Sequence, residues 1–339
     1  MEVFVKSFST YRTVKQATAL SHSLVLDSLD YETSTVTVKG TSIDRGDLGS
    51  WLIIDGAVFR ILDVKPEAGQ TVLTLETPLD AFSRPLELDA QPLDQTVGGF
   101  VAGQIQTHWA ACDDPVYAIP YLAMSNSDAT PFVSPELDNS GCFTLPDYCR
   151  LMRKSYRVTV RFADAGSTLA CSIVTAPVVS RQISFEDGRS KLEKVAFSAS
   201  GLAKITALQD VDTGEKDADG KAVLIRERTT WYLSESGEIS QMIPDRRAPG
   251  EWGTVQVQTG KNVLSKVTET FAKNKRSHKL EFCSSLDLDV QADCTFFVYG
   301  ELLRSYISYK RKSSTDKRFY YKSGELATTA TEKLKGVIK

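Results

Sequence analysis

Residues 49–64 read GSWLIIDGAVFRILDV, two apolar runs on either side of the pair Asp55-Gly56. An Asp-Gly pair between two such runs is a strong signal for a β-hairpin, because the type I′ turn requires a positive φ at both central residues. The sequence therefore predicts two antiparallel strands in this stretch, joined by a two-residue turn.

Four further segments around this hairpin have the composition of strands. Residues 4–8, 23–27, 34–40 and 71–76 are short, rich in β-branched or aromatic residues, and alternating in places. Turn residues separate them, so that a strand recurs about every ten residues. This spacing is typical of a small barrel or sandwich, and a barrel leaves no open strand edge.

The rest of the chain is predicted to contain more strand than helix. Apolar side chains share one helical face over 97–105, from Leu145 onward, and over 262–274. Strands are expected within 156–162, 168–174, 194–197, 203–208, 222–225, 229–233, 279–283 and 295–299. A loop is expected over 124–141, and an acidic hairpin tip over 210–221.

The overall composition excludes several classes of protein. The chain has 339 residues, a formal net charge of −3, 42% hydrophobic residues and 24% charged residues. This balance excludes a generally basic nucleic-acid binder and a disordered chain. The sequence contains no run of about 18 apolar residues, which is the length needed to span a bilayer. The first residues lack the basic end and apolar stretch of a signal peptide, so folding in the cytoplasm is expected.

The charges are distributed unevenly along the chain. Residues 1–150 contain 9 basic and 20 acidic residues, a net charge of −11, whereas residues 151–339 contain 31 and 23, a net charge of +8. Complementary charged surfaces steer the association of molecules, so the two parts are predicted to face different partners. Chance differences between separately folding domains would give the same numbers, and both interpretations stay open.

Motifs for catalysis and metal binding are absent from the sequence. It has no GxSxG, P-loop, HExxH or GxGxxG pattern. The pair Asp113-Asp114 is interpreted as a helix stop, and nothing in the sequence brings Cys149 near a histidine. The six cysteines show no CxxC or CxxH spacing and are expected to be small buried apolar residues. We therefore predict no catalytic residue, no metal ion, no cofactor and no enzymatic activity.

The most distinctive segment is 305–322, in which aromatic residues alternate with cations. Such a pattern binds single-stranded nucleic acid by stacking and phosphate contacts, but it also fits an exposed β-hairpin that contacts protein, with its turn at 313–317. The acidic half of the chain would repel a polyanion, which favours the second interpretation. The candidate protein-interaction residues are Lys310, Arg311, Lys312, Lys317, Arg318, Phe319, Tyr320 and Tyr321.

Two parts of the sequence resemble the hub proteins of phage tails. Residues 51–61, followed by 71–75 and 78–82, are similar to the start of such proteins, and 319–329 (FYYKSGELATT) is similar to their closing segment. The resemblance covers nearly the whole chain. From it the chain is identified as a baseplate or tail hub protein of a tailed bacteriophage or of a phage-derived contractile particle.

The resemblance implies a mainly β fold with minor α: two tube-protein-like β-barrel modules plus a mixed α/β segment. The expected segments are an N-terminal β-barrel module over 1–95, a mixed helical and loop segment over 96–155, a second β-rich module with inserted loops over 156–310, and a basic C-terminal hairpin and tail over 311–339. It implies no catalytic residue.

The resemblance also implies a homo-trimer whose six modules form a ring that joins the tail tube to the spike or tip. The implied partners are the tail tube protein, the spike or tip protein and the tape measure protein. No membrane partner is implied, and nucleic acid would be met only as DNA passing through the lumen. The implied location is the tail baseplate of a virion or phage-like particle, synthesised and assembled in the bacterial host cytoplasm.

Three other functions are alternatives to the hub. A host- or carbohydrate-binding β-module of a tail tip would be favoured if solvent-exposed tryptophans converged on a groove, because sugars stack on aromatic faces. The tryptophans in question are Trp51, Trp109, Trp231 and Trp252. A hydrolase would need titratable groups that converge in a pocket, and a nucleic-acid binder would use the basic hairpin.

Overall fold

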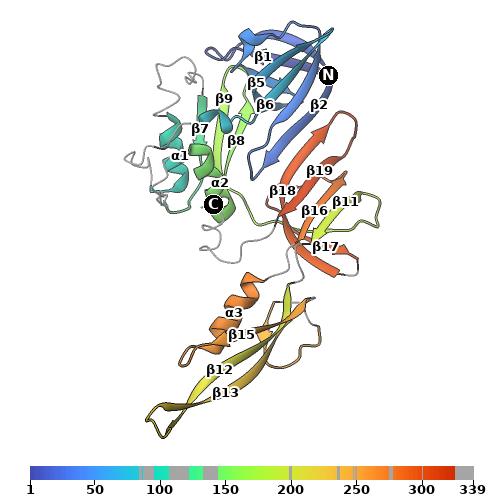
Figure 1. Ribbon diagram of the computed structural model, residues 1–339. Helices are drawn as coiled ribbons and strands as arrows, with labels where there is room; N and C mark the ends of the chain where they lie inside the picture. Colours follow the sequence, from blue (N-terminus) through green and yellow to red (C-terminus); the bar gives the residue numbers. More distant parts are fainter. Residues whose placement is uncertain are drawn as a thin grey trace. The chain divides into compact units, whose positions relative to one another are not determined.

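The computed structural model describes residues 1–83, 86, 95–106, 122–132, 144–197, 201–234, 237–246, 248, 250–274, 278–299 and 301–324. The chain divides into two compact units (Figure 1). Unit 1 comprises Met1–Glu193 and Glu281–Lys339, and unit 2 comprises Lys194–Leu280, which is inserted into it. The four segments expected from the sequence remain a prediction about the organisation of the chain.

A closed barrel forms the N-terminal part of unit 1. Its strands are β1 (Glu2–Lys6), β2 (Thr13–Ser28), β3 (Ser34–Lys39), β4 (Trp51–Ile54), β5 (Ala57–Glu67) and β6 (Gln70–Glu76). They pair in the order β1-β4-β5-β6-β3-β2, and β1 also pairs with β2, which closes the barrel. Asp55 and Gly56 between β4 and β5 have φ values of 53° and 78°. The predicted hairpin and the predicted barrel are both confirmed.

The barrel core follows from alternation along the strands. In β6 every second residue is buried, and Leu73 and Leu75 face the same interior as Val36 and Val38 of β3. The short strand β4 is buried on both sides. Leu52 and Ile54 point into the barrel, whereas Trp51 and Ile53 belong to a second core outside the barrel wall. The barrel therefore has an outer face that another element must cover.

A second group of six strands continues the same sheet. The strands are β10 (Ser180–Ile183), β11 (Ser190–Phe197), β16 (His278–Ser284), β17 (Asp293–Val298), β18 (Glu301–Ser313) and β19 (Phe319–Gly324). The strand β2 extends beyond the barrel to pair with β18, and the order then continues β18-β19-β16-β11, with β17 between β18 and β10. Packed rings form the core of this group, with Phe282 5.4 Å from Phe296 and 5.2 Å from Tyr321 between centroids.

A mixed layer covers the outer face of the barrel. It contains β7 (Leu122–Asn126), β8 (Val158–Asp164) and β9 (Leu169–Thr175) in the order β7-β9-β8. Its helices are α1 (Val97–Ile105) and α2 (Leu145–Tyr156), both at the predicted positions. The hydroxyl of Thr96 caps α1, and Thr144 and Asp147 form a capping box at the start of α2.

Two sequence predictions in this layer were wrong in part. Residues 124–126 lie in β7 instead of a loop, because they pair in parallel with β9, a contact distant in sequence. The predicted loop residues 133–141 lie outside the described residues. Tyr156 ends α2 instead of starting a strand. The side chain of Asn126 approaches the backbone of Gly98 in α1 closely, since a Cβ there would lie 2.3 Å from Oδ1 of Asn126. This close approach explains why a glycine occupies the position.

Unit 2 is a four-stranded sheet with one helix. Its elements are β12 (Leu202–Lys216), β13 (Ala222–Leu233), β14 (Ile239–Ser240), β15 (Glu251–Val257) and α3 (Val263–Lys273). The strand order is β14-β13-β12-β15, with β15 parallel to β12. The expected hairpin tip at 210–221 is shorter in the structure, because β12 runs to Lys216 and Asp210 pairs with Arg226 across the hairpin. No helix in the described part of the chain is long and apolar enough to cross a membrane.

Candidate functional site

The helix α2 carries a row of cations at the centre of unit 1. Arg150, Arg153 and Lys154 have the i, i+3, i+4 spacing that places side chains on one helical face, and Arg157 follows as the C-cap residue. Each makes an ion pair with an acidic residue of another element of the fold. The partners are Asp80, Asp27, Asp30 and Asp293, respectively.

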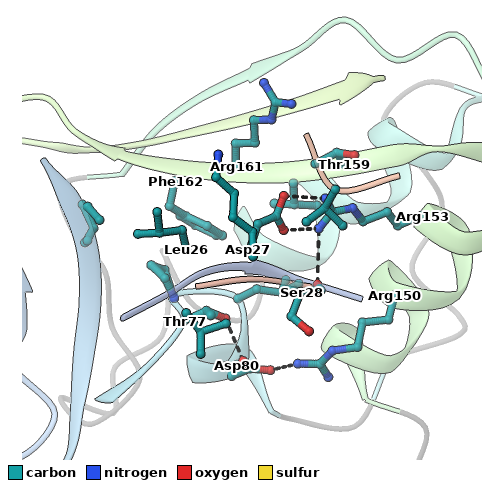
Figure 2. Close-up of a pocket in the computed structure, with 18 of the residues that line it drawn as sticks. Leu26, Asp27, Ser28, Thr77, Asp80, Arg150, Arg153, Thr159, Arg161 and Phe162 are labelled. Carbon is teal, nitrogen blue, oxygen red and sulfur yellow. Dashed lines mark hydrogen bonds and ion pairs between the residues drawn. The ribbon is translucent and has the colours of Figure 1, made fainter. Parts of the chain in front are cut away.

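Two of these pairs fasten α2 to the barrel side (Figure 2). Arg153 donates two parallel hydrogen bonds to Asp27 of β2, of 2.6 and 2.7 Å. Arg150 pairs with Asp80, whose other oxygen accepts a hydrogen bond of 2.7 Å from Thr77. The Arg153 side chain is only 12% exposed. Removing one partner of such a shielded pair leaves a poorly solvated charge, so a single substitution at either partner should destabilise unit 1.

The C-terminal end of α2 is fastened to the second strand group. Arg157 adopts a left-handed conformation with φ 63°. Its guanidinium donates to the carbonyl of Gln291 at 2.9 Å and to Asp293 of β17 at 3.2 Å. The side-chain amide of Gln291 donates back to the carbonyl of Arg153. The α2 helix therefore ties the barrel to the second strand group.

A cavity of about 330 Å³ lies beside this row of ion pairs. Its lining includes Asp27 and Asp80, and Figure 2 shows both carboxylates turned toward arginines of α2. Both carboxylates therefore act as structural ion-pair partners, and we assign no catalytic role to this cavity. Within the described ranges, no group of three or more His, Cys, Asp or Glu side chains could hold a metal ion.

The described cysteines behave as the sequence predicted. Cys149, Cys171, Cys283 and Cys294 are buried and free of disulfide bonds. Burial raises the pKa of Cys171 to about 12. It also raises the pKa of Cys149, so neither thiol is activated as a nucleophile. The remaining cysteines and the pair Asp113-Asp114 lie outside the described residues.

The candidate interaction residues gather on the β18–β19 hairpin, and two of the candidate lysines make ion pairs within the chain. Lys310 pairs with Asp287 and lies 4.9 Å from the ring centroid of Phe319. Lys312 pairs with Asp55 in the barrel hairpin. Lys317, in the turn between the strands, is exposed. Two of the five candidate cations, Lys310 and Lys312, are therefore matched by acidic residues of unit 1.

Other candidates make ring contacts and hydrogen bonds within the chain. The Arg311 guanidinium lies 4.8 Å from the ring centroid of Tyr320. Arg318 donates to the carbonyl of Gly188 at 3.2 Å. Tyr321 is 1% exposed, and its hydroxyl donates to the carbonyl of Leu286 at 2.7 Å; burial raises the pKa of Tyr321. The hairpin contributes to the core of unit 1 as well as to its surface.

The uneven charge distribution is reflected in contacts within unit 1. Arg153, Lys154, Lys312 and Lys322, all from the basic half, pair with Asp27, Asp30, Asp55 and Glu32 of the acidic half. Sequence reasoning missed the α2 cations, although their spacing was visible. Their partners were not, because Asp27 and Arg153 lie 126 residues apart.

The described tryptophans do not converge on one groove. Trp51 is 1% exposed in unit 1. Trp231 packs in the core under α3, whereas Trp252 is 66% exposed and pairs with Lys204 in the neighbouring strand. Trp109 lies outside the described residues. The arrangement that would have favoured a carbohydrate-binding groove shared by several tryptophans is not observed among the described residues.

No protein-family model matches the chain, and no curated protein matches it in sequence. Among solved structures, the prophage tail protein gp18 from Listeria monocytogenes matches 100% of this chain and 99% of its own, with a TM-score of 0.50 and 11% identity. The chain has the fold of a phage tail protein. The resemblance seen in the sequence is thereby confirmed at the level of the fold.

Two further solved structures are similar to the chain with lower TM-scores. A protein of the phage P2 baseplate in its activated conformation has a TM-score of 0.44 and 11% identity, over 97% of this chain and 99% of its own. The Escherichia coli c3393 protein, a component of the type VI secretion system, has a TM-score of 0.47 and 7% identity, over 96% and 77%.

Proposed function

We propose that the chain is a structural hub protein of a phage-like tail baseplate, in which three copies form a ring that joins the tail tube to the spike or tip. The observation that carries the proposal is the likeness to a prophage tail protein over the full length of both chains. The closed barrel, the second strand group and the mixed layer all fall within that likeness, so the proposal concerns the whole chain.

The arrangement of strands supports a ring. Each chain has two groups of six strands, joined where β2 pairs with β18. Three copies would present six such groups, which suits a sixfold tube above and a threefold spike below. The ion pairs of α2 tie the two groups within each chain. A ring subunit needs such contacts between its two strand groups, because neighbouring subunits would bind both of them.

The proposed partners are further copies of this chain, the tail tube protein, the spike or tip protein and the tape measure protein. In this proposal the chain acts without catalysis, in the tail baseplate of the virion or phage-like particle after assembly in the host cytoplasm. The β18–β19 hairpin is the proposed contact with a neighbour. Lys317 is an exposed cation in its turn.

The proposal is tested by the mass of the purified full-length protein. Light scattering should give three times the monomer mass, and electron microscopy should show rings that bind the cognate tube protein. Lys317→Glu should weaken ring formation or tube binding. Lys221→Glu, an exposed control in the turn of the unit 2 hairpin, should leave both unchanged. A protein that stays monomeric at all concentrations, with or without tube protein, would contradict the hub.

A further inference from the structure

Unit 2 has one sheet face that α3 does not cover. On the covered face, Ile205 and Ala207 of β12 pack against Val267 and Phe271 of α3. Successive strand residues point to opposite sides. Lys204, Thr206 and Leu208 therefore lie on the other side, together with the residues paired to them in β13 and β15. We call this surface the open face.

One row of the open face forms an aromatic platform. Lys204 is paired in register with Tyr232 of β13 and with Trp252 of β15. Its ammonium lies 3.6 Å from the ring centroid of Trp252 and 5.5 Å from that of Tyr232. The indole N–H of Trp252 donates to the hydroxyl of Thr206 at 2.9 Å. The indole is thus held by two contacts.

The exposure of this held indole is the unusual feature. Trp252 is 66% exposed, although tryptophan is mostly buried in folded proteins. An exposed side chain usually loses conformational freedom when it binds a ligand, and that loss weakens binding. Here the cation and the hydrogen bond already restrict the ring, so the cost is small. Trp252 is therefore a preorganised apolar plate that faces solvent.

A polar hollow continues the open face along the strands. It has a volume of about 450 Å³ and is lined by Leu208, Gln256, Gln258 and the ion pair between Asp210 and Arg226, among others. Arg226 donates to Asp210 at 2.8 and 3.3 Å. Gln256 lies four residues from Trp252 along β15, which is roughly 13 Å at the rise of an extended strand. The plate and the hollow form one elongated surface.

We propose that the open face binds an acidic oligosaccharide. The C–H face of a sugar ring stacks on an aromatic plate such as Trp252, and amide and guanidinium groups match neighbouring hydroxyls. The cations Lys204, Arg226 and Arg228 outnumber the carboxylates Asp210 and Asp212 on this face, which attracts carboxylate or phosphate groups on the sugar. The distance from plate to hollow fits several linked rings. This inference is independent of the proposed hub function.

The test uses the full-length chain and a hexamer of guluronate, with cellohexaose as an uncharged hexamer for comparison. Calorimetry and tryptophan fluorescence should show that the guluronate hexamer binds and that cellohexaose binds at least tenfold more weakly. Trp252→Ala should lower affinity for the guluronate hexamer at least tenfold, and Trp252→Phe should retain part of it. Arg228→Gln should reduce the advantage of the acidic sugar over the neutral one.

The matched control is Tyr299→Ala, which removes a 78% exposed aromatic side chain from unit 1 and should leave sugar binding unchanged. Circular dichroism should confirm that all variants fold. Failure of the wild-type chain to bind either sugar, or binding that survives Trp252→Ala, would overturn the proposal. Concentration-dependent self-association that Trp252→Ala abolishes, without sugar binding, would make the open face a protein interface instead. Ring formation is scored separately, so failure of the hub proposal stays distinguishable.

Discussion

Two sheet faces of the molecule each carry a tryptophan, and only one face is covered. The outer face of the barrel presents Trp51, which is 1% exposed because α1, α2 and β9 pack over it. The open face of unit 2 presents Trp252, which is 66% exposed. Strand composition alone does not separate the two cases. What separates them is whether the chain supplies a layer to cover that side.

The comparison teaches where stability and binding reside. The covered face is part of a large core that extends from the barrel wall to α2 and β9. Unit 2 has a small core of five buried residues, three from the sheet and two from α3. The free energy by which a core stabilises the folded state is roughly proportional to the apolar area that the core buries. We therefore expect unit 1 to hold most of the stability and the open face to be free for recognition.

The largest effect should come from Trp51→Ala. Truncating a buried aromatic residue removes its transfer free energy and leaves a cavity, so unfolding should become about 3–5 kcal/mol easier. Urea unfolding followed by circular dichroism measures it. Trp51→Phe should cost much less, because the indole N–H of Trp51 has no hydrogen-bond acceptor among the described residues. A loss below about 1 kcal/mol for the alanine variant would break the comparison.

A smaller effect is expected at Asp128 of unit 1. Its carboxylate accepts hydrogen bonds from Gly98 N at 2.7 Å, from Thr130 N at 3.1 Å and from the Thr175 hydroxyl at 2.6 Å. Asp128→Ala leaves these donors without their acceptor and should destabilise by about 1–3 kcal/mol in the same urea assay. Asp210→Ala in unit 2 removes an exposed carboxylate and should cost less. Equal losses would contradict the argument.

The pH dependence at Asp128 has a definite sign. Burial alone raises the pKa of this carboxyl, but the hydrogen bonds from Thr175, Thr130 and Gly98 lower the pKa more. A carboxyl with a lowered pKa stabilises the fold above its unfolded pKa of about 3.9, and the contribution disappears as pH falls through the folded value. Urea unfolding below pH 4 should therefore show a smaller difference between wild type and Asp128→Ala.

Local signals in the sequence predicted most of the elements. The Asp55-Gly56 turn, the start of α2 at Leu145 and the alternation within 71–76 are decided by neighbouring residues. Contacts between distant segments were not predictable. The pairing of β7 with β9 converted part of an expected loop into strand, and closure of the barrel by β1 and β2 depends on the whole fold.

The candidate site was harder to predict than the fold for the same reason. The basic character of the hairpin residues was visible, but their partners Asp287 and Asp55 are brought close only by the sheet. The alternation of residue types around Tyr321 is visible in the sequence. Nothing in the neighbouring residues shows that Tyr321 faces the Phe282 ring. Trp252 likewise gave no sign of exposure, because exposure depends on where α3 packs.

A third prediction concerns the seam where β2 leaves the barrel. His22 is 6% exposed, and neither ring nitrogen has a hydrogen-bond partner among the described residues. Burial lowers the pKa of His22, and the charge of Lys312 lowers it further, while Asp55 opposes the shift. The unfolded chain then takes up the proton first, so stability should fall as pH drops below about 6.5.

The measurement is urea unfolding of unit 1 at pH 7.5 and pH 5. Wild type should lose stability between these values, and His22→Phe should lose less, because the phenyl ring fills the site without a titrating group. A pH dependence that is unchanged in His22→Phe would assign the effect to other groups. Unit 2 should show no dependence on this substitution, because His22 belongs to unit 1.

The smallest effect should come from Trp252→Ala, and it completes the comparison with Trp51. Little apolar area is removed from water when Trp252 folds into place, since 66% of it stays exposed. The free energy of unfolding should change by no more than about 0.5 kcal/mol. Ile205→Ala, on the same sheet but under α3 and fully buried, should cost about 2–5 kcal/mol. A large loss for Trp252→Ala would show that the indole supports the sheet. A small loss together with abolished sugar binding would separate recognition from stability on the two faces of one sheet.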